Sequence, residues 1–203
     1  EEYNEPIEDI ANNNENTNIS KEVEPKEILY DNEESIEINI PKSDRINSDA
    51  IAIVIGNETY SSPDINDVSY ASEDVETMRN YLVNTFGFRE GNVIVMNNAT
   101  LADFNRTFGN KQNFQARLYN LVKPQKSDVF VYYTGHGAPS LVDQEGYLVP
   151  VECQDISLLQ FEGYSLNTLF ENLAQIPYKS LTVVLDACFS GNTHNGALIK
   201  NAS

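Results

Sequence analysis

The chain has 203 residues, which is enough for one good-sized hydrophobic core or for a core with an appended segment. Its formal net charge is −18, and residues 1–50 alone carry 15 acids and 4 bases, for a net charge of −11. Such an acidic surface argues against binding to nucleic acids and to anionic membranes, because both attract basic patches, and it is compatible with cationic substrates.

The first 34 residues are rich in Asn and Glu and show no sustained hydrophobic period. Such a segment buries too little apolar surface to offset the entropy lost on ordering. The alternation of Ser35–Ile40 then predicts a half-exposed strand that ends at Pro41. By default this is an edge strand, although a propeptide-like segment lying on the rest of the protein is an alternative. We therefore expect an acidic leader over residues 1–45 and a folded domain over residues 46–203.

The folded part alternates strand and helix patterns. Apolar runs predict buried strands at 51–55, 92–96, 128–134 and 181–186, with a hairpin arm at 146–151. Helical spacing predicts helices over 68–82, 100–108, 114–121 and 165–173, the last of which would bury Leu166, Leu169, Phe170 and Leu173. Thr100 with Asp103 forms a capping box at the start of the second helix. Strands that alternate with helices predict parallel βαβ units, and hence an α/β fold of three layers.

Two of these strands end at reactive side chains. The run Asp128-Val-Phe-Val-Tyr-Tyr-Thr-Gly-His-Gly137 ends at a histidine, and Leu181-Thr-Val-Val-Leu-Asp-Ala-Cys-Phe-Ser-Gly191 ends at a cysteine. Both strands lack polar alternation, so we expect both of their faces to be covered. Catalytic groups in open α/β sheets gather at the carboxyl ends of strands, so His136 and Cys188 meet if the two strands are neighbours. A histidine beside a thiol can take its proton and generate the nucleophilic thiolate.

The motifs Tyr132-Tyr-Thr-Gly-His-Gly137 and Asp186-Ala-Cys-Phe-Ser-Gly191 resemble those of the caspase superfamily, peptidase C14. They are more similar to bacterial caspase-like proteins and metacaspases than to animal caspases, and the likeness runs from about Ile51 to Gly191. His136 precedes Cys188 by 52 residues, close to the separation of about 50 in caspases. One departure is Phe189, where metacaspases commonly carry His.

The resemblance implies a three-layer α/β/α sandwich of the caspase-haemoglobinase type. Caspase-like domains have further strands after the Cys motif, so it also implies that the chain is the large-subunit portion. A small subunit or a downstream C-terminal segment would then complete the sheet.

The resemblance further implies a cysteine endopeptidase in which Cys188 attacks the peptide carbonyl and His136 transfers the proton. Backbone N–H groups of Gly137 and Cys188 would form the oxyanion hole. In metacaspase-like proteins the residue matching Asp186 lines the S1 pocket together with a second acid.

The best match for that second acid is Asp74, and Asp67 is the competing register. An acidic pocket would select Arg or Lys at P1. Two alternatives to the peptidase remain. One is a caspase-like pseudoenzyme or protein-interaction module, and the other is a non-peptidase hydrolase with a Cys-His pair.

The sequence offers little for metals or disulfides. His194 has no partner at zinc-ligand spacing, and Cys153 fits a structural residue. Metacaspases often depend on Ca²⁺, but the carboxylates after His136 match no calcium-ligand motif (Asp143, Glu145, Glu152 and Asp155). We expect no required cofactor, with Ca²⁺ as the alternative.

The chain contains no run of about 18 apolar residues, so no membrane span is expected. Its first residues do not form a signal peptide. We expect a soluble protein, either cytoplasmic or exported after removal of a signal peptide.

Overall fold

The computed structural model describes residues 39–140, 142–189, 192–193 and 196–197, which belong to one compact unit, Ile38–Ser203. The predicted leader lies outside the described residues except for its last few, and so do Gly191 and His194. Most of the predicted strand Ser35–Ile40 is outside them as well, and its last two residues have no strand structure.

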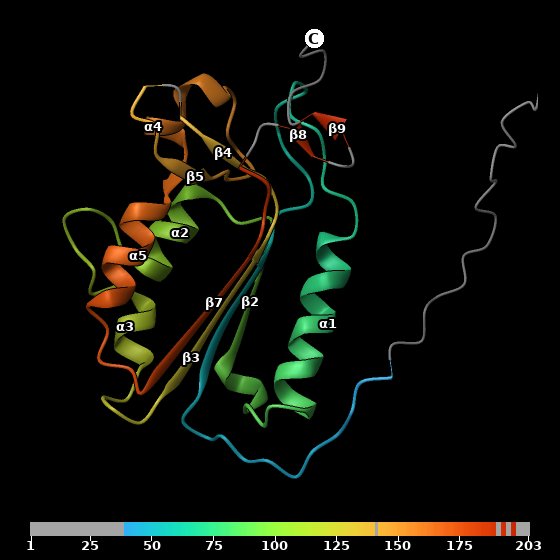
Figure 1. The fold of residues 1–203 in the computed structure, drawn as a ribbon, viewed down its shortest axis with the longest axis vertical. Coiled ribbons are helices and arrows are strands. Elements are labelled where there is room, and N and C mark those ends of the chain that lie inside the picture. Colours follow the sequence, from blue (N-terminus) through green and yellow to red (C-terminus); the bar gives the residue numbers. More distant parts are fainter. Residues whose placement is uncertain (1–38, 141, 190–191, 194–195, 198–203) are drawn as a thin grey trace, which may run out of the picture. The chain divides into compact units, whose positions relative to one another are not determined.

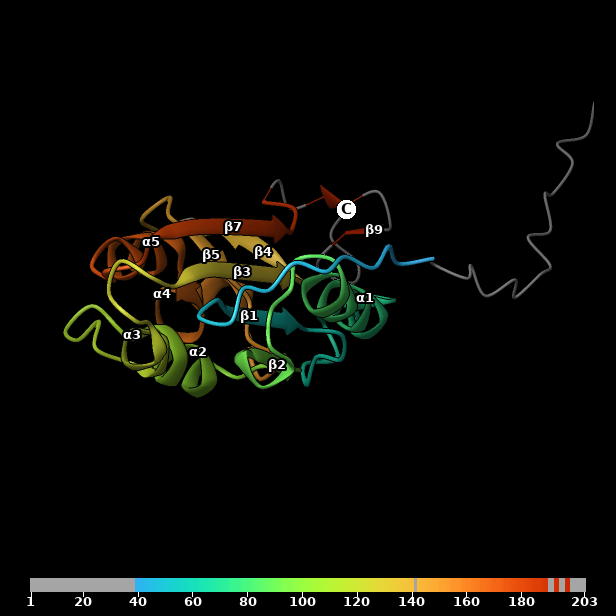
Figure 2. The ribbon, with the colours of Figure 1, turned by 90° about the horizontal axis from the view of Figure 1, so that it is seen from below.

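The centre of this unit is a parallel sheet of four strands, in the order β2-β1-β3-β7. The strands are β1 (Ile51–Gly56), β2 (Val93–Asn97), β3 (Asp128–Thr134) and β7 (Ser180–Asp186). Figure 2 shows them side by side, with β7 and β2 at the two edges. All four predicted strands are confirmed to within a residue or two, because long Val, Ile and Leu runs are stable only when buried in such a sheet.

Helices cover both faces of the sheet (Figures 1 and 2). One face packs against α1 (Ala71–Asn84), and the other against α2 (Leu101–Phe108), α3 (Arg117–Leu121) and α5 (Leu166–Ala174). Three further short helices are η1 (Glu90–Asn92), η2 (Ile156–Leu158) and α4 (Leu159–Glu162). The three-layer α/β/α sandwich is therefore confirmed.

The predicted helices differ from the observed ones in detail. The capping box of Thr100 and Asp103 is present, but α1 begins at Ala71 instead of Val68, because Tyr70 has a left-handed φ of 70° that breaks the helix. The third helix has only five residues and leaves out Phe114. The prediction that Phe170 is buried was wrong, since its side chain is 46% exposed on the outer side of α5.

The prediction that both faces of the last strand are covered was also wrong. Strand β3 is covered on both faces, but burial alternates along β7. Leu181, Val183 and Leu185 pack against the core beneath α5, whereas Val184 on the other face is 37% exposed. The cause is position: α1 packs over β1, β2 and part of β3 but stops short of the outermost strand.

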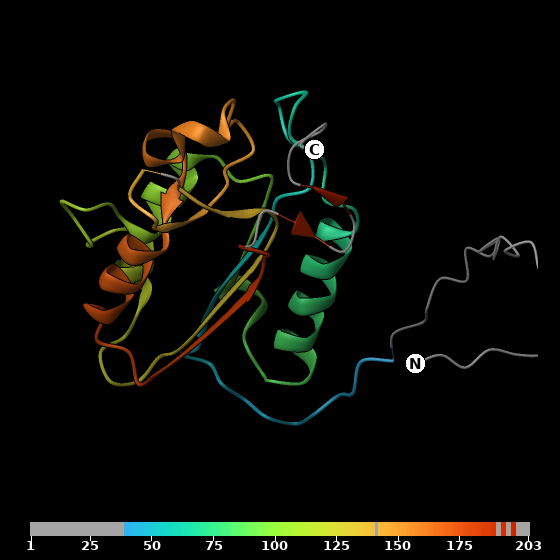
Figure 3. The ribbon, with the colours of Figure 1, turned by 45° about the horizontal axis from the view of Figure 1, so that its top comes forward.

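A second, antiparallel sheet of three short strands lies beyond the carboxyl ends of the central strands (Figures 1 and 3). It consists of β4 (Gly137–Pro139), β5 (Gly146–Leu148) and β6 (Tyr164–Ser165), in that order. The predicted hairpin arm is thus present but ends at Leu148. Two further strands, β8 (Asn192–Thr193) and β9 (Gly196–Ala197), pair with each other. Because β4 starts directly after His136, the histidine sits at the junction of the two larger sheets.

Candidate active site

The strands that precede His136 and Cys188 are neighbours in the sheet. In the parallel pairing of β3 with β7, Thr134 lies opposite Asp186, and the Gly135 N–H donates to the Asp186 carbonyl oxygen at 3.4 Å. His136 lies two residues after the end of β3, and Cys188 lies two residues after the end of β7. The two segments therefore leave the same edge of the sheet side by side, as the sequence predicted.

The residues next to the histidine and the cysteine are in contact. Gly137 follows His136, and Phe189 follows Cys188. The Phe189 ring packs so closely on Gly137 that a Cβ atom at position 137 would lie 2.5 Å from the Cε1 atom of the ring. The ring also packs against the core beneath α5. This contact joins the two loops, and it requires a residue without a side chain at position 137.

For the cysteine peptidase that the sequence motifs imply, Gly137→Ala is expected to lower activity, since the added methyl group must push Phe189, and with it the neighbouring Cys188, away from the His136 loop. Displacing a reacting group by about 1 Å costs roughly 100-fold in rate. The measurement is kcat/KM of the purified full-length protein on a peptide substrate. Gly91→Ala is the matched control, because nothing lies within 4 Å of a Cβ atom there. Equal activity of the two variants would show that the Phe189 contact does not position the site.

One nitrogen of the His136 imidazole makes a hydrogen bond to the main chain. Its Nε2 atom lies 2.7 Å from the main-chain oxygen of Asn66. A carbonyl oxygen only accepts hydrogen bonds, so Nε2 carries the proton in the neutral ring. The lone pair is then on Nδ1, which becomes the proton acceptor that His136 offers to a thiol.

Burial lowers the pKa of His136, and the hydrogen bond to Asn66 and the nearby charge of Asp67 offset this only in part. The side chain is 7% exposed. A lowered pKa keeps the imidazole neutral at pH 7, and it stays neutral further into the acidic range than an ordinary histidine. The neutral ring is the form that can act as a base.

The two cysteines have opposite environments. Cys188 is exposed, whereas Cys153 is buried and 1% exposed. Burial, followed by the hydrogen bond and the charge of Glu162, raises the pKa of Cys153 to about 12. The Cys153 thiol therefore stays protonated and packs as a small apolar residue among its neighbours. Only Cys188 is accessible to a substrate.

Asp186 lies close enough to Asp74 for its charge to act on the Asp74 carboxyl. Burial, then the charges of Asp186 and Glu73, raise the pKa of the Asp74 carboxyl. Tyr132 lies in the same environment, where burial and the charges of Asp74 and Asp186 raise its pKa to about 12. Two acids from different elements, the first turn of α1 and the end of β7, thus share one face of the sheet. Such a pair attracts a cation.

Asp67, the competing candidate, has a different surrounding. Its Oδ1 atom accepts the main-chain N–H of Tyr60 at 3.0 Å, and its charge acts on His136. It belongs to the loop that holds the histidine, which favours Asp74 as the partner of Asp186.

The four carboxylates considered for calcium do not form a site. Asp143 binds the hydroxyl group of Tyr147. The others bind partners elsewhere: Glu145 with Ser165, Glu152 with the N–H of Leu101, and Asp155 with the N–H of Ser157. Within the described residues, no group of three or more His, Cys, Asp or Glu side chains could hold a metal ion. These residues therefore do not fit a calcium-binding set.

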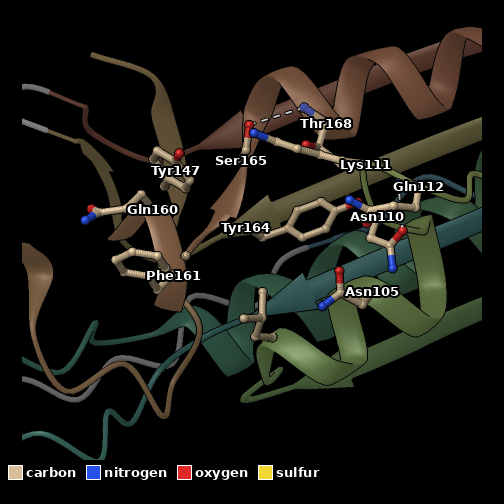
Figure 4. Close-up of a pocket in the computed structure, with 12 residues that line it drawn as sticks. Asn105, Asn110, Lys111, Gln112, Tyr147, Gln160, Phe161, Tyr164, Ser165 and Thr168 are labelled. Atoms are coloured by element: carbon tan, nitrogen blue, oxygen red, sulfur yellow. Dashed lines mark hydrogen bonds between the residues drawn. The ribbon is translucent and has the colours of Figure 1, made fainter. Parts of the chain in front are cut away.

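A pocket of about 340 Å³ lies between α2, α4, β6 and α5 (Figure 4). Its lining combines aromatic rings such as Tyr164 with the side-chain amides of Asn105 and Gln112. Neither the histidine and cysteine nor the acid pair lines it.

Besides Asn66, two tyrosines bind His136: the Tyr60 hydroxyl oxygen accepts its N–H, and the Tyr133 hydroxyl donates to its carbonyl oxygen. The sequence did not identify any of these three residues. Tyr60 and Asn66 belong to a loop after β1 without any hydrophobic period, and Tyr133 resembles every other apolar residue of β3. Asn66 acts through its main-chain oxygen, for which no residue type is a signal.

Comparison with known proteins identifies the domain. The Peptidase_C14 family model, described as a caspase domain, matches residues 49–203. A search of curated proteins finds none that matches the chain. None of the helices in the described part of the chain has the length and apolar character needed to cross a membrane.

Proposed function

Since the chain belongs to the Peptidase_C14 family of cysteine peptidases through its caspase domain, we propose that it is an endopeptidase that cleaves after Arg or Lys. The observation that carries this proposal is the pairing of β3 with β7, which brings the segments of His136 and Cys188 to one edge of the sheet. The alternative of a pseudoenzyme or interaction module has no comparable support, because both reactive side chains are present.

In the proposed reaction, Nδ1 of His136 takes the proton of the Cys188 thiol, and the sulfur bonds to the carbonyl carbon of the substrate. The C–N bond breaks as the same proton passes to the leaving amine, which leaves a thioester. Water then attacks the thioester with His136 as base, releasing the acid and the thiol. Backbone N–H groups of Gly137 and Cys188 would stabilise the oxyanion, a contribution of roughly 3–4 kcal/mol per donor.

We assign the preference for basic residues to Asp74 and Asp186. The charge of Asp186 contributes to the raised pKa of Asp74. This supports the assignment, because two carboxylates that repel each other gain stability when a cation enters between them. Arg fits better than Lys, since a planar guanidinium can donate to both acids at once.

We further propose that a small subunit or a downstream segment pairs with β7. The support is that β7 is an edge strand of the described sheet and leaves Val184 exposed on the face that α1 does not reach. An uncovered edge strand with an apolar face is otherwise prone to self-association. The proposal includes no required cofactor.

A panel of fluorogenic peptides that differ only at P1 tests the specificity. We expect the full-length protein to cleave the Arg and Lys peptides, with Arg preferred, and to leave the Asp and Gln peptides intact. Each assay is run with calcium and with a chelator, so that a need for Ca²⁺ becomes visible. Cleavage after Asp with no cleavage after Arg or Lys would refute the assignment of the acid pair.

A further inference from the structure

The loop Glu58–Val68 supports His136 through a side chain that the proposed mechanism does not use. We propose that Tyr60 is a positioning residue for the catalytic base, fixing both the main chain and the ring of His136. This inference rests on the proposed peptidase function, but its structural part can be measured without substrate.

Two tyrosine hydroxyl groups clamp the main chain of His136. The hydroxyl oxygen of Tyr60 accepts the N–H of His136 at 2.9 Å, and the Tyr133 hydroxyl donates to the carbonyl oxygen of His136 at 2.7 Å. The N–H of Val149 also donates to this oxygen at 3.0 Å. All of these groups are buried, so loss of the Tyr60 bond would leave the N–H of His136 in a place that water does not reach. The peptide groups on either side of His136 therefore have one favoured orientation.

The aromatic ring of Tyr60 holds the imidazole itself. The two ring centroids are 4.8 Å apart, and the planes are tilted by 42°. The Tyr60 ring packs against one side of the imidazole while the carbonyl group of Asn66 binds its Nε2 atom. Of the two ring nitrogens, the hydrogen bond to Asn66 uses Nε2 and not Nδ1. Tyr60 thus helps to select which nitrogen is available as the base.

Tyr60 is itself anchored by the loop that carries Asn66. Its N–H donates to Oδ1 of Asp67, the residue next to Asn66, at 3.0 Å. The N–H of Val68 donates to the carbonyl oxygen of Glu58 at 2.8 Å and closes the loop. One short segment therefore carries both the tyrosine and the carbonyl group that bind His136. A shift of the tyrosine is coupled to a shift of the carbonyl group.

Tyr60 also belongs to a buried apolar cluster with Ile65 and Tyr147, so a purely structural role is the competing explanation. The substitution Tyr60→Phe separates the two explanations. It keeps the ring and its packing but removes the acceptor for the His136 N–H. Tyr164→Phe is the matched control: Tyr164 is also buried, at 2% exposed, and its hydroxyl group donates to the carbonyl oxygen of Gly109 at 2.9 Å. Both variants lose one buried hydrogen bond to the main chain, but only one of these bonds involves His136.

For Tyr60→Phe in the full-length protein we expect kcat to fall roughly 10- to 100-fold, with KM for the same peptide unchanged. Tyr164→Phe should keep both constants near the parent values. A second readout is the ¹⁵N NMR spectrum of the imidazole groups, which is simple because the chain has only two histidines. In the parent, Nε2 of His136 should be the protonated nitrogen of the neutral ring, and in Tyr60→Phe a mixture of both tautomers should appear.

The two readouts separate failure of this inference from failure of the proposed function. If Tyr60→Phe keeps the parent tautomer and the parent kcat, or if Tyr164→Phe loses as much, Tyr60 is only a core residue and the inference is overturned. If the tautomer changes only in Tyr60→Phe while the parent protein cleaves no peptide, the positioning of His136 stands and the peptidase proposal fails.

Discussion

Cys188→Ala is expected to abolish peptide hydrolysis, lowering kcat by roughly four orders of magnitude or more. The second cysteine, Cys153, cannot take its role, because it is buried with a pKa of about 12. Cys188 is exposed and lies beyond the end of β7, so its truncation should leave thermal stability unchanged. The measurement is turnover of an Arg peptide by the full-length protein, together with the melting temperature of each variant.

Cys153→Ala is the matched control for this experiment. It should keep full peptidase activity but lose roughly 1 kcal/mol of stability, because it shortens a buried side chain. Alkylation by iodoacetamide gives a second test: Cys188 should react, and Cys153 should not until the protein unfolds. Residual hydrolysis by Cys188→Ala at the parent rate would remove Cys188 from the mechanism.

The sequence was sufficient for the architecture because its strands are long apolar runs that are stable only inside a sheet. It also predicted that the His136 and Cys188 segments share an edge, since catalytic groups in parallel sheets gather where strands end. It could not predict that one face of β7 is exposed. The run Thr182-Val-Val-Leu185 has the same composition as a doubly buried strand, and its exposure depends on where α1 stops.

Sequence patterns could not predict the residues that bind His136 either. Tyr60 and Tyr133 act on His136 through hydroxyl groups that come from separate elements. Such contacts depend on distances across the fold and leave no periodic signal in the chain. Conversely, Asp74 could be proposed only through the resemblance, and its proximity to Asp186 becomes visible only when α1 is packed on the sheet.

Asp186→Asn and Asp74→Asn are each expected to lower kcat/KM for an Arg peptide roughly 30- to 100-fold, the effect of removing one charged hydrogen-bond partner. The loss should lie mainly in KM, because these side chains bind the substrate and do not react. Glu73→Gln is the matched control. It removes a neighbouring carboxylate in the same turn of α1, and we expect it to change kcat/KM little. An equal loss in Glu73→Gln would indicate a general effect of acidic charge.

The pH dependence of KM tests the acid pair independently. Burial and the charge of Asp186 raise the pKa of Asp74, so Asp74 becomes protonated at higher pH than an ordinary aspartic acid, whose pKa is about 3.9. A protonated carboxyl no longer attracts a guanidinium group. KM for an Arg peptide should therefore rise as the pH falls, and this rise should begin at lower pH in Asp186→Asn, where the repelling charge is gone. The acidic limb of kcat reports His136 instead and should not move with Asp186. If both limbs shift together, or if KM does not depend on pH in the parent protein, Asp74 and Asp186 do not bind the substrate cation.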